Sequence, residues 1–417
     1  MSYDATCRRN WKARIARTVK KLPAHISKPQ HKLVTEVLTG MLLSGSAVLA
    51  DIGRALGEPV DLHQTEKRLS RMLGQHGHLA RIVRDLALER MRGFITPKMV
   101  IGIDPGDLNR DGSSKSEWIS LVHDGSTGGI VNGYPLMSVV ARDPKTRRDY
   151  PLYVKLYSPE ETDHESQNAE VIAAMRQVRA QVPHDCLWAM DCGGDAGVFW
   201  KFWLKEKFRI VVRADNKRHW AWRGRKMFAQ DIAKQVPCKH KGQIGRGKKK
   251  REVAFGITKV RLPAYMDRQL WMIVVRHGKL QPMVLVTTCP VRGRSQGQTM
   301  IDAYLERWAC EDGYRFLKQG FNLEQMQVRN FNAIRNLVAI AGLAWVLLAR
   351  YQAKAPELLH KARRLKKKAD SRRPFYALLD GLKALFAGIK DIFYSVLRKP
   401  WPPDMPLIPG LFKVRAI

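Results

Sequence analysis

The stretch Val100-Ile101-Gly102-Ile103-Asp104 decides the fold class of this chain. An apolar run that ends in a carboxylate is typical of a buried strand. Cys186-Leu187-Trp188-Ala189-Met190-Asp191 has the same pattern, and Arg209-Ile210-Val211-Val212-Arg213 is a third run of this kind with basic ends. Three such runs predict the centre of a sheet.

The segments around these runs predict the rest of one domain. Strand patterns also occupy 130–141 and 150–157, and helical patterns occupy 165–182 and 196–208. The resulting order is three strands, helix, strand, helix, strand, which predicts an α/β fold.

Residues 1–95 have a helical pattern throughout. Two short helices are expected at 47–56 and 63–73, with Gly57 and Pro59 in the turn between them. This is the outline of a helix-turn-helix, whose second helix would present Lys67, Arg68 and Arg71 to DNA. Two short helices around such a turn are also common in proteins that do not bind DNA, so both interpretations stay open.

The second half of the chain begins with a β-rich insertion, expected at 216–282. A basic tract within it contains Lys248, Lys249 and Lys250. Residues 283–287 return to the main sheet, and a long helix is expected at 298–319. The 13-residue apolar run from Leu337 to Ala349 is too short to span a bilayer, which takes roughly 20 residues, so it predicts a buried helix.

The charge of the chain points to a polyanionic partner. Its 417 residues hold 73 Lys and Arg against 38 Asp and Glu, a net charge of +35, and 45% are hydrophobic, which is enough for a sizeable core. Nucleic acid is the first candidate partner, because no long basic amphipathic helix favours a membrane surface. Six scattered cysteines and the lack of a signal-peptide pattern predict a reduced, cytoplasmic protein.

Two carboxylates, Asp104 and Asp191, stand at the ends of apolar strands. A carboxylate at the edge of a core needs a partner such as a cation or a helix N-terminus. Two Mg²⁺ ions held there could cleave a phosphodiester. Taken singly, each carboxylate is better explained as a turn or capping residue, and Asp107, Asp111 and Asp195 are rivals; Asp195 could cap the following helix.

The helix expected at 298–319 carries Tyr304, Arg307, Glu311 and Lys318 at offsets 0, 3, 7 and 14. These positions fall within about 60° of one another on a helix. The acid could hold metal while the bases hold phosphate oxygens. The alternative is a solvated face with an Arg307–Glu311 ion pair.

This pattern, Y-x2-R-x3-E-x6-K, resembles the signature of bacterial cut-and-paste insertion-sequence transposases of the DDE group. These enzymes share a ribonuclease H-like fold with retroviral integrases. Gly102-Ile103-Asp104 and Ala189-Met190-Asp191-Cys192-Gly193-Gly194-Asp195 resemble the family's other two motifs. The resemblance runs from about residue 98 to 350.

The resemblance implies that Asp104, Asp191 and Glu311 bind two Mg²⁺ ions, for which Mn²⁺ can substitute. It implies that a homodimer cleaves transposon inverted-repeat ends and joins the 3′ ends to target DNA. In the family, cleavage passes through a DNA hairpin. Tyr304, Arg307, Lys318 and Arg213 would contact DNA. Residues 1–95 would bind the DNA ends, 96–350 would form the catalytic domain, and the basic helical region 351–417 would serve dimerisation by analogy.

The chain departs from the family where relatives carry a Trp that supports a flipped base, because Met283 stands there. Met283 or Trp271 is therefore the candidate for base flipping, and Met283 could equally be ordinary core packing. Two other functions remain open: a catalytically inactive DNA-binding descendant of a transposase, and a DDE nuclease that cuts without strand transfer.

Overall fold

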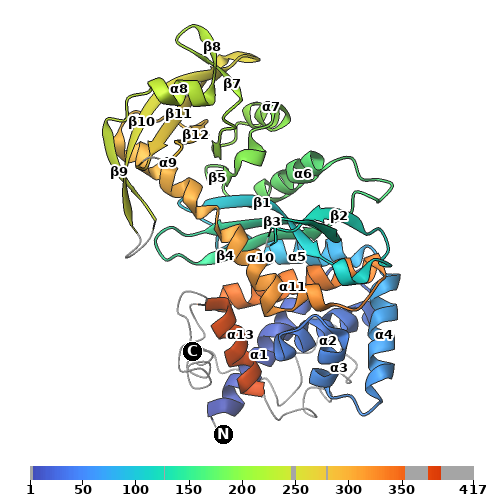
Figure 1. Ribbon diagram of the computed structural model, residues 1–417. Helices are drawn as coiled ribbons and strands as arrows, with labels where there is room; N and C mark the ends of the chain where they lie inside the picture. Colours follow the sequence, from blue (N-terminus) through green and yellow to red (C-terminus); the bar gives the residue numbers. More distant parts are fainter. Residues whose placement is uncertain (1–2, 126, 246–249, 279, 353–373, 387–417) are drawn as a thin grey trace.

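The computed structural model describes residues 3–125, 127–245, 250–278, 280–352 and 374–386 (Figure 1). In this part of the chain, the strands join in one mixed sheet of order β2-β3-β1-β5-β6-β12-β11-β10-β7-β8, with β4 beside β3 and β9 beside β10. The first six strands are β1 (Val100–Asn109), β2 (Ser120–His123), β3 (Ile130–Arg142), β4 (Asp149–Leu156), β5 (Leu187–Met190) and β6 (Ile210–Arg213). The predicted α/β class is confirmed.

Strand β1 is the middle of this sheet. It pairs antiparallel with β3 and parallel with β5, and β5 pairs parallel with β6. Helices α6 (Gln167–Arg179) and α7 (Gly197–Lys205) supply the crossovers between the parallel strands. Their apolar residues, among them Met175 and Trp203, pack with Trp188 of β5 on one face of the sheet.

The other face is covered by α9 (Arg294–Glu306). Met300, Ile301 and Tyr304 of α9 pack with residues such as Ala189 of β5 and Leu285 of β12. Helix α10 (Ala309–Gly320) follows and lies against β1 and β3. The sequence predicts one helix over this region, whereas the structure has two, separated at Arg307 and Trp308. At this break the Arg307, Trp308 and Cys310 amides bond to the carbonyl three residues back rather than four, which tightens and ends α9.

The insertion continues the sheet. It comprises β7 (His219–Trp222), β8 (Arg225–Phe228), α8 (Ala229–Gln235), β9 (His240–Ile244), β10 (Arg251–Leu262) and β11 (Tyr265–Arg276). Strand β12 (Met283–Thr287) pairs antiparallel with both β11 and β6, so the insertion is hydrogen-bonded to the main sheet.

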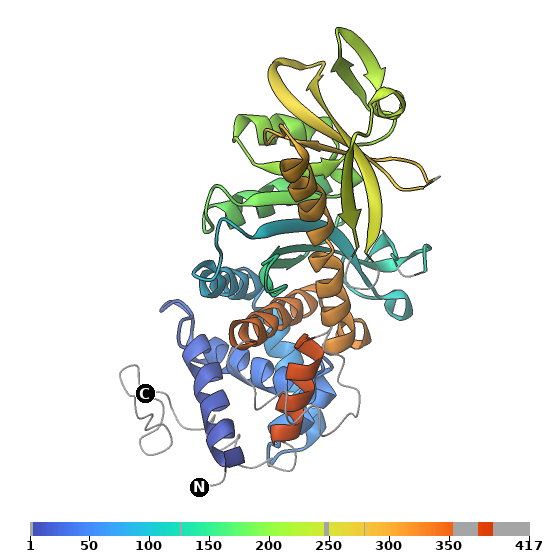
Figure 2. The same cartoon turned by 90° about the vertical axis from the view of Figure 1, so that its left-hand side faces the viewer.

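The N-terminal helices form a bundle below the sheet (Figures 1 and 2). They are α1 (Tyr3–Val19), α2 (Lys28–Ser44), α3 (Leu49–Leu56), α4 (Leu62–Gln75) and α5 (Leu79–Arg92), and α13 (Pro374–Phe386) packs beside α2. Their core is continuous with that of the sheet.

Helix α11 (Phe331–Tyr351) joins the bundle to the sheet, because it contacts α2, α4 and α5 as well as β4. It is long and apolar enough to cross a membrane by length and composition, but 89% of its apolar window is buried inside the protein. The predicted buried helix is confirmed. Its fully buried Asn336 donates hydrogen bonds of 2.8 Å to the Leu73 carbonyl and 2.9 Å to the His76 carbonyl, which fixes the end of α4.

Candidate active site

Asp104 and Asp191 come together because of the register between two parallel strands. The last β1–β5 pair is Gly102 with Ala189, and each carboxylate follows two residues later. Strand β1 does not end at Asp104, as the sequence pattern suggests. It continues to Asn109 because β3 still pairs with it after β5 has ended. Asp104 therefore lies beside an open position in the sheet, next to the end of β5.

Glu311 reaches the same place from the first turn of α10. The close approach of this helix depends on Gly102, since a Cβ there would lie 3.1 Å from Cys310 Sγ and 3.2 Å from Arg307 Cα. Electrostatic interactions link Asp104 to both Asp191 and Glu311. Three carboxylates that are distant in the sequence thus share one site.

Arg307 lies between two of these carboxylates. Its Nη1 is 3.3 Å from Asp104 Oδ2, and its Nη2 is 3.2 Å from Glu311 Oε1. The residue is 8% exposed, and its Nε is buried without a hydrogen-bond partner among the described residues. A buried guanidinium with a spare donor can bind a further anionic oxygen, such as one of a phosphodiester.

Burial raises the pKa of Asp104 to about 7; the Arg307 guanidinium opposes this rise, and the carboxylates of Asp191 and Glu311 add to it. The pKa of Arg307 is itself raised, because the nearby carboxylates, Asp104 first, outweigh its burial. The negative charge of these three carboxylates therefore exceeds the single positive charge of Arg307.

The chemistry of these donors fits a divalent cation. Oxygen ligands are those that Mg²⁺ prefers, and it needs few from the protein because water and phosphate complete its shell. Within the described residues, however, no three His, Cys, Asp or Glu side chains converge tightly enough to form a preformed metal site. Instead, the Arg307 guanidinium lies between Asp104 and Glu311 and supplies the positive charge that these two carboxylates need.

Tyr304 and Arg213 border this cluster. Tyr304 is 5% exposed and lies under the Arg307 guanidinium, 5.8 Å from ring centroid to Cζ. Its phenol also interacts with Arg213, the exposed last residue of β6. The buried Tyr304 thus orients two basic side chains, whereas Arg213 itself faces solvent.

Lys318, the fourth residue of the helical motif, has internal partners. Its Nζ lies 2.6 Å from Asp107 Oδ2 and 3.0 Å from Glu324 Oε1, and its side chain is 18% exposed. Asp107, one of the rival acids, is therefore the ion-pair partner of Lys318.

Asp195, another rival acid, is part of a buried network. Its carboxylate accepts a 2.6 Å hydrogen bond from Trp200 Nε1 and a 2.7 Å bond from the Asp215 amide, and it forms a 2.6 Å ion pair with Arg218 Nε. The capping interpretation of Asp195 is wrong, because the N-cap of α7 is Ala196. Asp111, the third rival, is exposed in a single turn of 3₁₀ helix.

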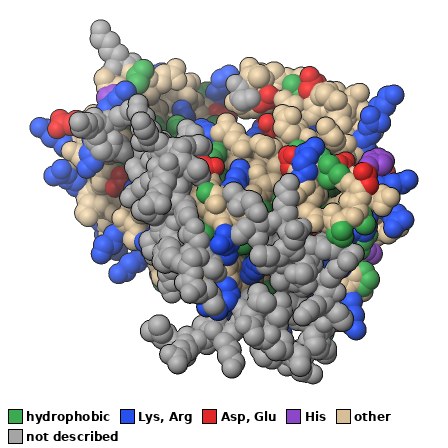
Figure 3. Space-filling model, turned by 90° about the horizontal axis from the view of Figure 1, so that it is seen from below, with side chains coloured by type: hydrophobic (Ala, Val, Ile, Leu, Met, Phe, Trp, Pro, Cys, Tyr) green, Lys and Arg blue, Asp and Glu red, His purple; other side chains and the backbone are tan. Residues whose placement is uncertain are grey.

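The helix-turn-helix outline corresponds to α3 and α4. On α4, Lys67 and Arg71 are exposed. Arg68 instead turns inward, where it lies 2.7 Å from a carboxylate oxygen of both Glu36 and Glu58. Seen from below, Lys and Arg side chains lie along both sides of the visible surface (Figure 3). Of the basic tract, Lys250 is exposed, while Lys248 and Lys249 lie outside the described residues.

Met283 and Trp271 occupy different ends of neighbouring strands. Met283 pairs with Val275, whereas Trp271 pairs with Thr287. Because Leu285 of β12 pairs with Arg213, Met283 lies two residues beyond the level of Arg213, on the side of the carboxylates. Trp271 lies four positions away along the ladder, about 14 Å. Both side chains are half-buried against the α9 face of the sheet.

Sequence reasoning overlooked Trp308. This residue lies at the break between α9 and α10, directly after Arg307, and is 53% exposed. A large exposed aromatic ring beside a charged cluster is a common means of stacking on a base. The signal was available, since a tryptophan interrupts the charged motif at its centre.

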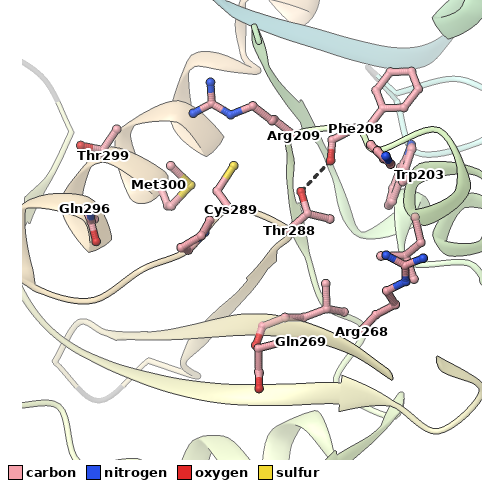
Figure 4. Close-up of a pocket in the computed structure, with 14 residues that line it drawn as sticks. Trp203, Phe208, Arg209, Arg268, Gln269, Thr288, Cys289, Gln296, Thr299 and Met300 are labelled. Carbon is pink, nitrogen blue, oxygen red and sulfur yellow. Dashed lines mark hydrogen bonds between the residues drawn. The ribbon is translucent and has the colours of Figure 1, made fainter. Parts of the chain in front are cut away.

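A separate cavity of about 560 Å³ lies at the opposite end of β6 (Figure 4). Thr288 Oγ1 donates a 2.7 Å hydrogen bond to the Phe208 carbonyl at its wall, and Arg209, Arg268, Cys289 and Met300 also line it. None of the described residues that line it is acidic. It therefore lacks the groups that could serve the chemistry of the carboxylate cluster.

Comparison with known proteins adds to this geometry. Residues 145–347 match the protein family described as "Transposase DDE domain", a segment that includes Asp191 and Glu311 but not Asp104. No curated protein matches the chain. One similar solved structure is the cryo-EM structure of the piggyBac transposase synaptic complex with hairpin DNA. The TM-score is 0.45 with 12% sequence identity, over 95% of this chain and 82% of that chain. The family match supports a DDE transposase.

The raised pKa of Asp104 predicts a pH-dependent stability in the absence of metal. The native carboxyl binds its proton up to about pH 7, whereas an unfolded aspartate releases it near pH 4. Stability from this group is thus complete below about pH 4 and is lost as the pH rises to about 7. In EDTA, the free energy of unfolding of wild type minus that of Asp104→Asn should fall by a few kcal/mol across this interval.

Urea titrations at a series of pH values measure this difference. Asp111→Asn, which removes an exposed carboxylate, is the control and should show no such trend. A flat difference between Asp104→Asn and wild type would contradict the assignment of a shared, buried charge site.

Proposed function

We propose that this protein is a DNA transposase that binds the inverted-repeat ends of its element, cleaves them by two-metal phosphodiester hydrolysis and joins the 3′ ends to target DNA. The observation that carries this proposal is that Arg307 contacts Asp104 and Glu311 directly, and that Asp191 lies close enough to act on Asp104 electrostatically. The match of residues 145–347 to a transposase domain supports it.

The sheet supports a ribonuclease H-like core. Strands β4, β3, β1, β5 and β6 are adjacent in that order. The first two pairings are antiparallel and the last two are parallel. Such a core presents carboxylates where its central parallel pairing ends, and Asp104 and Asp191 each lie two residues beyond the last β1–β5 pair.

Asp104, Asp191 and Glu311 are the residues that would hold Mg²⁺, with Mn²⁺ as a substitute. When bound, two such ions activate the attacking oxygen and stabilise the leaving oxygen of the phosphodiester. Arg307 would then transfer its interactions from the carboxylates to phosphate oxygens.

The protein supplies positioning around this centre. Exposed Arg213 would bind a phosphate next to the cleaved bond, and Tyr304 would hold Arg213 and Arg307 at a fixed separation. Lys318 is paired with Asp107 and Glu324, so its main role would be structural: it links α10 to β1. A contact with DNA would compete with these ion pairs.

The remaining parts of the proposal concern assembly. Cleavage would pass through a DNA hairpin, and a homodimer would hold two ends in a synaptic complex in the bacterial cytoplasm, on the nucleoid. Residues 351–417 would contribute to dimerisation. The net charge of +35 supports a DNA partner for each of these states.

One experiment separates this function from its two alternatives. The protein is supplied with Mg²⁺, pre-cut DNA ends and a target plasmid, and uncut ends are tested in parallel. Joining of ends to the plasmid indicates a transposase, cutting without joining indicates a nuclease, and binding alone indicates an inactive DNA-binding protein.

Loss of any one carboxylate should abolish cleavage. For Asp104→Asn, Asp191→Asn and Glu311→Gln, we expect the cleavage rate in Mg²⁺ to fall at least about a thousand-fold, or about 4 kcal/mol. Binding of DNA ends should persist because it depends mainly on basic side chains. Asp111→Asn is the control and should cleave normally. A variant that cleaves at nearly the wild-type rate would remove that residue from the site.

The α4 helix should distinguish ends from other DNA through Lys67 and Arg71. Lys67→Ala with Arg71→Ala should lower the ratio of specific to random DNA affinity at least about tenfold, with little change in melting temperature. Arg68→Ala should instead destabilise the fold by about 3 kcal/mol, since it leaves Glu36 buried without its main partner. Equal loss on both DNAs for the double variant would contradict a recognition role of α4.

Base flipping should depend on Trp308 more than on Met283 or Trp271. An adenine analogue placed beside the cleavage site should fluoresce more strongly when the complex forms, because it leaves the stack. Trp308→Ala should remove most of this increase, since its ring is 53% exposed beside Arg307. Trp271→Ala is the matched aromatic control and should retain the increase. If Trp308→Ala behaves as wild type, stacking on this ring is excluded.

A further inference from the structure

The β7–β8 hairpin projects from the far end of the sheet (Figures 1 and 2). Trp222 pairs with Arg225, and the two residues between them, Arg223 and Gly224, have φ angles of 49° and 76°. Two left-handed residues make the tight turn that suits a twisted hairpin. An arginine is uncommon at such a position, where asparagine or glycine would avoid strain.

The hairpin and the segment leading into it carry exposed basic side chains. Lys217, Arg223, Arg225 and Lys226 are exposed, and no Asp or Glu occurs between residues 216 and 230. Among the described residues, none of these four is in an ion pair with a carboxylate. Arg218 differs, because it is bound to Asp195.

Two tryptophans of β7 hold the hairpin in place, Trp220 in the middle of the strand and Trp222 next to the turn. Trp220 is fully buried and packs edge-on against Trp200, with ring centroids 5.6 Å apart. Trp222 is 4% exposed, and its Nε1 donates a 2.8 Å hydrogen bond to Thr258 Oγ1. The Arg223 guanidinium lies 4.5 Å from the Trp222 ring centroid. The basic side chains are therefore presented on a fixed support.

A groove of about 560 Å³ lies at the foot of the hairpin. Lys217, His219 and Lys226 line one side, and the β10–β11 turn with Tyr265 lines another. The one carboxylate on the wall, Asp215, accepts a 2.7 Å hydrogen bond from the Lys217 amide. The basic surface thus continues from the turn into a concave site.

We propose that this hairpin and groove form a second DNA-binding surface, separate from the carboxylate cluster, which holds duplex DNA beyond the cleaved end. This inference rests on the proposed function. A fixed two-stranded ribbon with basic tips can enter the major groove, which is about 12 Å wide, while the groove residues bind phosphates.

The sheet gives an estimate of the distance between this surface and the carboxylate cluster. Five strand spacings separate β5, which ends just before Asp191, from β7. At about 4.8 Å each, they span about 24 Å. Duplex DNA advances about 3.4 Å per base pair, so the hairpin would meet DNA roughly seven base pairs from the reacting phosphate.

Graded DNA length tests this proposal with the full-length protein. The variant Arg223→Asn, Arg225→Gln, Lys226→Gln removes three charges and keeps a turn residue that tolerates positive φ. Its affinity is measured for end duplexes that stop 4, 8, 12 or 16 base pairs from the cleavage site, on each side. We expect wild-type affinity on the shortest duplex and at least a tenfold loss on the longer ones. The dependence of log affinity on log salt should fall by two to three units, at about 0.9 per lost phosphate contact.

The matched control is Lys201→Gln, Lys205→Gln, Lys207→Gln, which removes three exposed charges at α7. It should not produce a length-dependent loss. Equal losses in both variants, equal loss at all lengths, or no loss would each overturn the proposal. Cleavage of the shortest duplex by the wild-type protein is measured separately. If it fails, the proposed transposase function is contradicted, but the dependence of binding on duplex length can still be interpreted. Melting temperatures verify that both variants are folded.

Discussion

The placement of the Arg307 guanidinium between Asp104 and Glu311 is the interaction on which the rest of the site depends. It joins the middle of β1 to the start of α10 across 203 residues of sequence. Burying Asp104 without a partner would cost several kcal/mol, and the negative charge of the half-buried Glu311 nearby adds to that cost. The guanidinium makes the arrangement tolerable without removing the excess negative charge, which is visible in the raised pKa of Asp104.

The backbone is adapted to bring this arginine in. Helices α9 and α10 separate at Arg307 and Trp308, so α9 can cover one face of the sheet while α10 turns to pass beside β1 and β3. Gly102 allows the closest approach, and Gly313 accommodates the Trp345 ring, since a Cβ there would lie 2.3 Å from it. The same break exposes Trp308. The break between α9 and α10 thus lets both helices pack on the sheet and leaves the Trp308 ring exposed beside Arg307.

Sequence patterns were sufficient for the features that are local. Apolar runs ending in a carboxylate located β1 and β5. The spacing of Tyr304, Arg307 and Glu311 predicted that they lie near one another, but the single helix expected to carry them is divided between α9 and α10. The patterns could not show which charges pair with each other, because those pairs join distant segments. Arg68 with Glu36, Lys318 with Asp107, and Arg218 with Asp195 all look like free charges in the sequence. The helix break was also hidden, since nothing in residues 304–311 is a helix breaker such as proline.

These internal pairs change the meaning of the +35 net charge. Each basic residue that neutralises a buried acid is removed from the surface that DNA could contact, while the overall charge stays the same. Within the part of the chain that the structure describes, exposed basic residues without a carboxylate partner include Lys67 and Arg71 on α4, Arg213 beside the carboxylates, and those of the β7–β8 hairpin. They lie on the bundle, at the middle of the sheet and at its far end (Figure 1). A duplex that met all three would be held along the length of the molecule, with the phosphate next to the cleaved bond fixed by Arg213 rather than by net attraction.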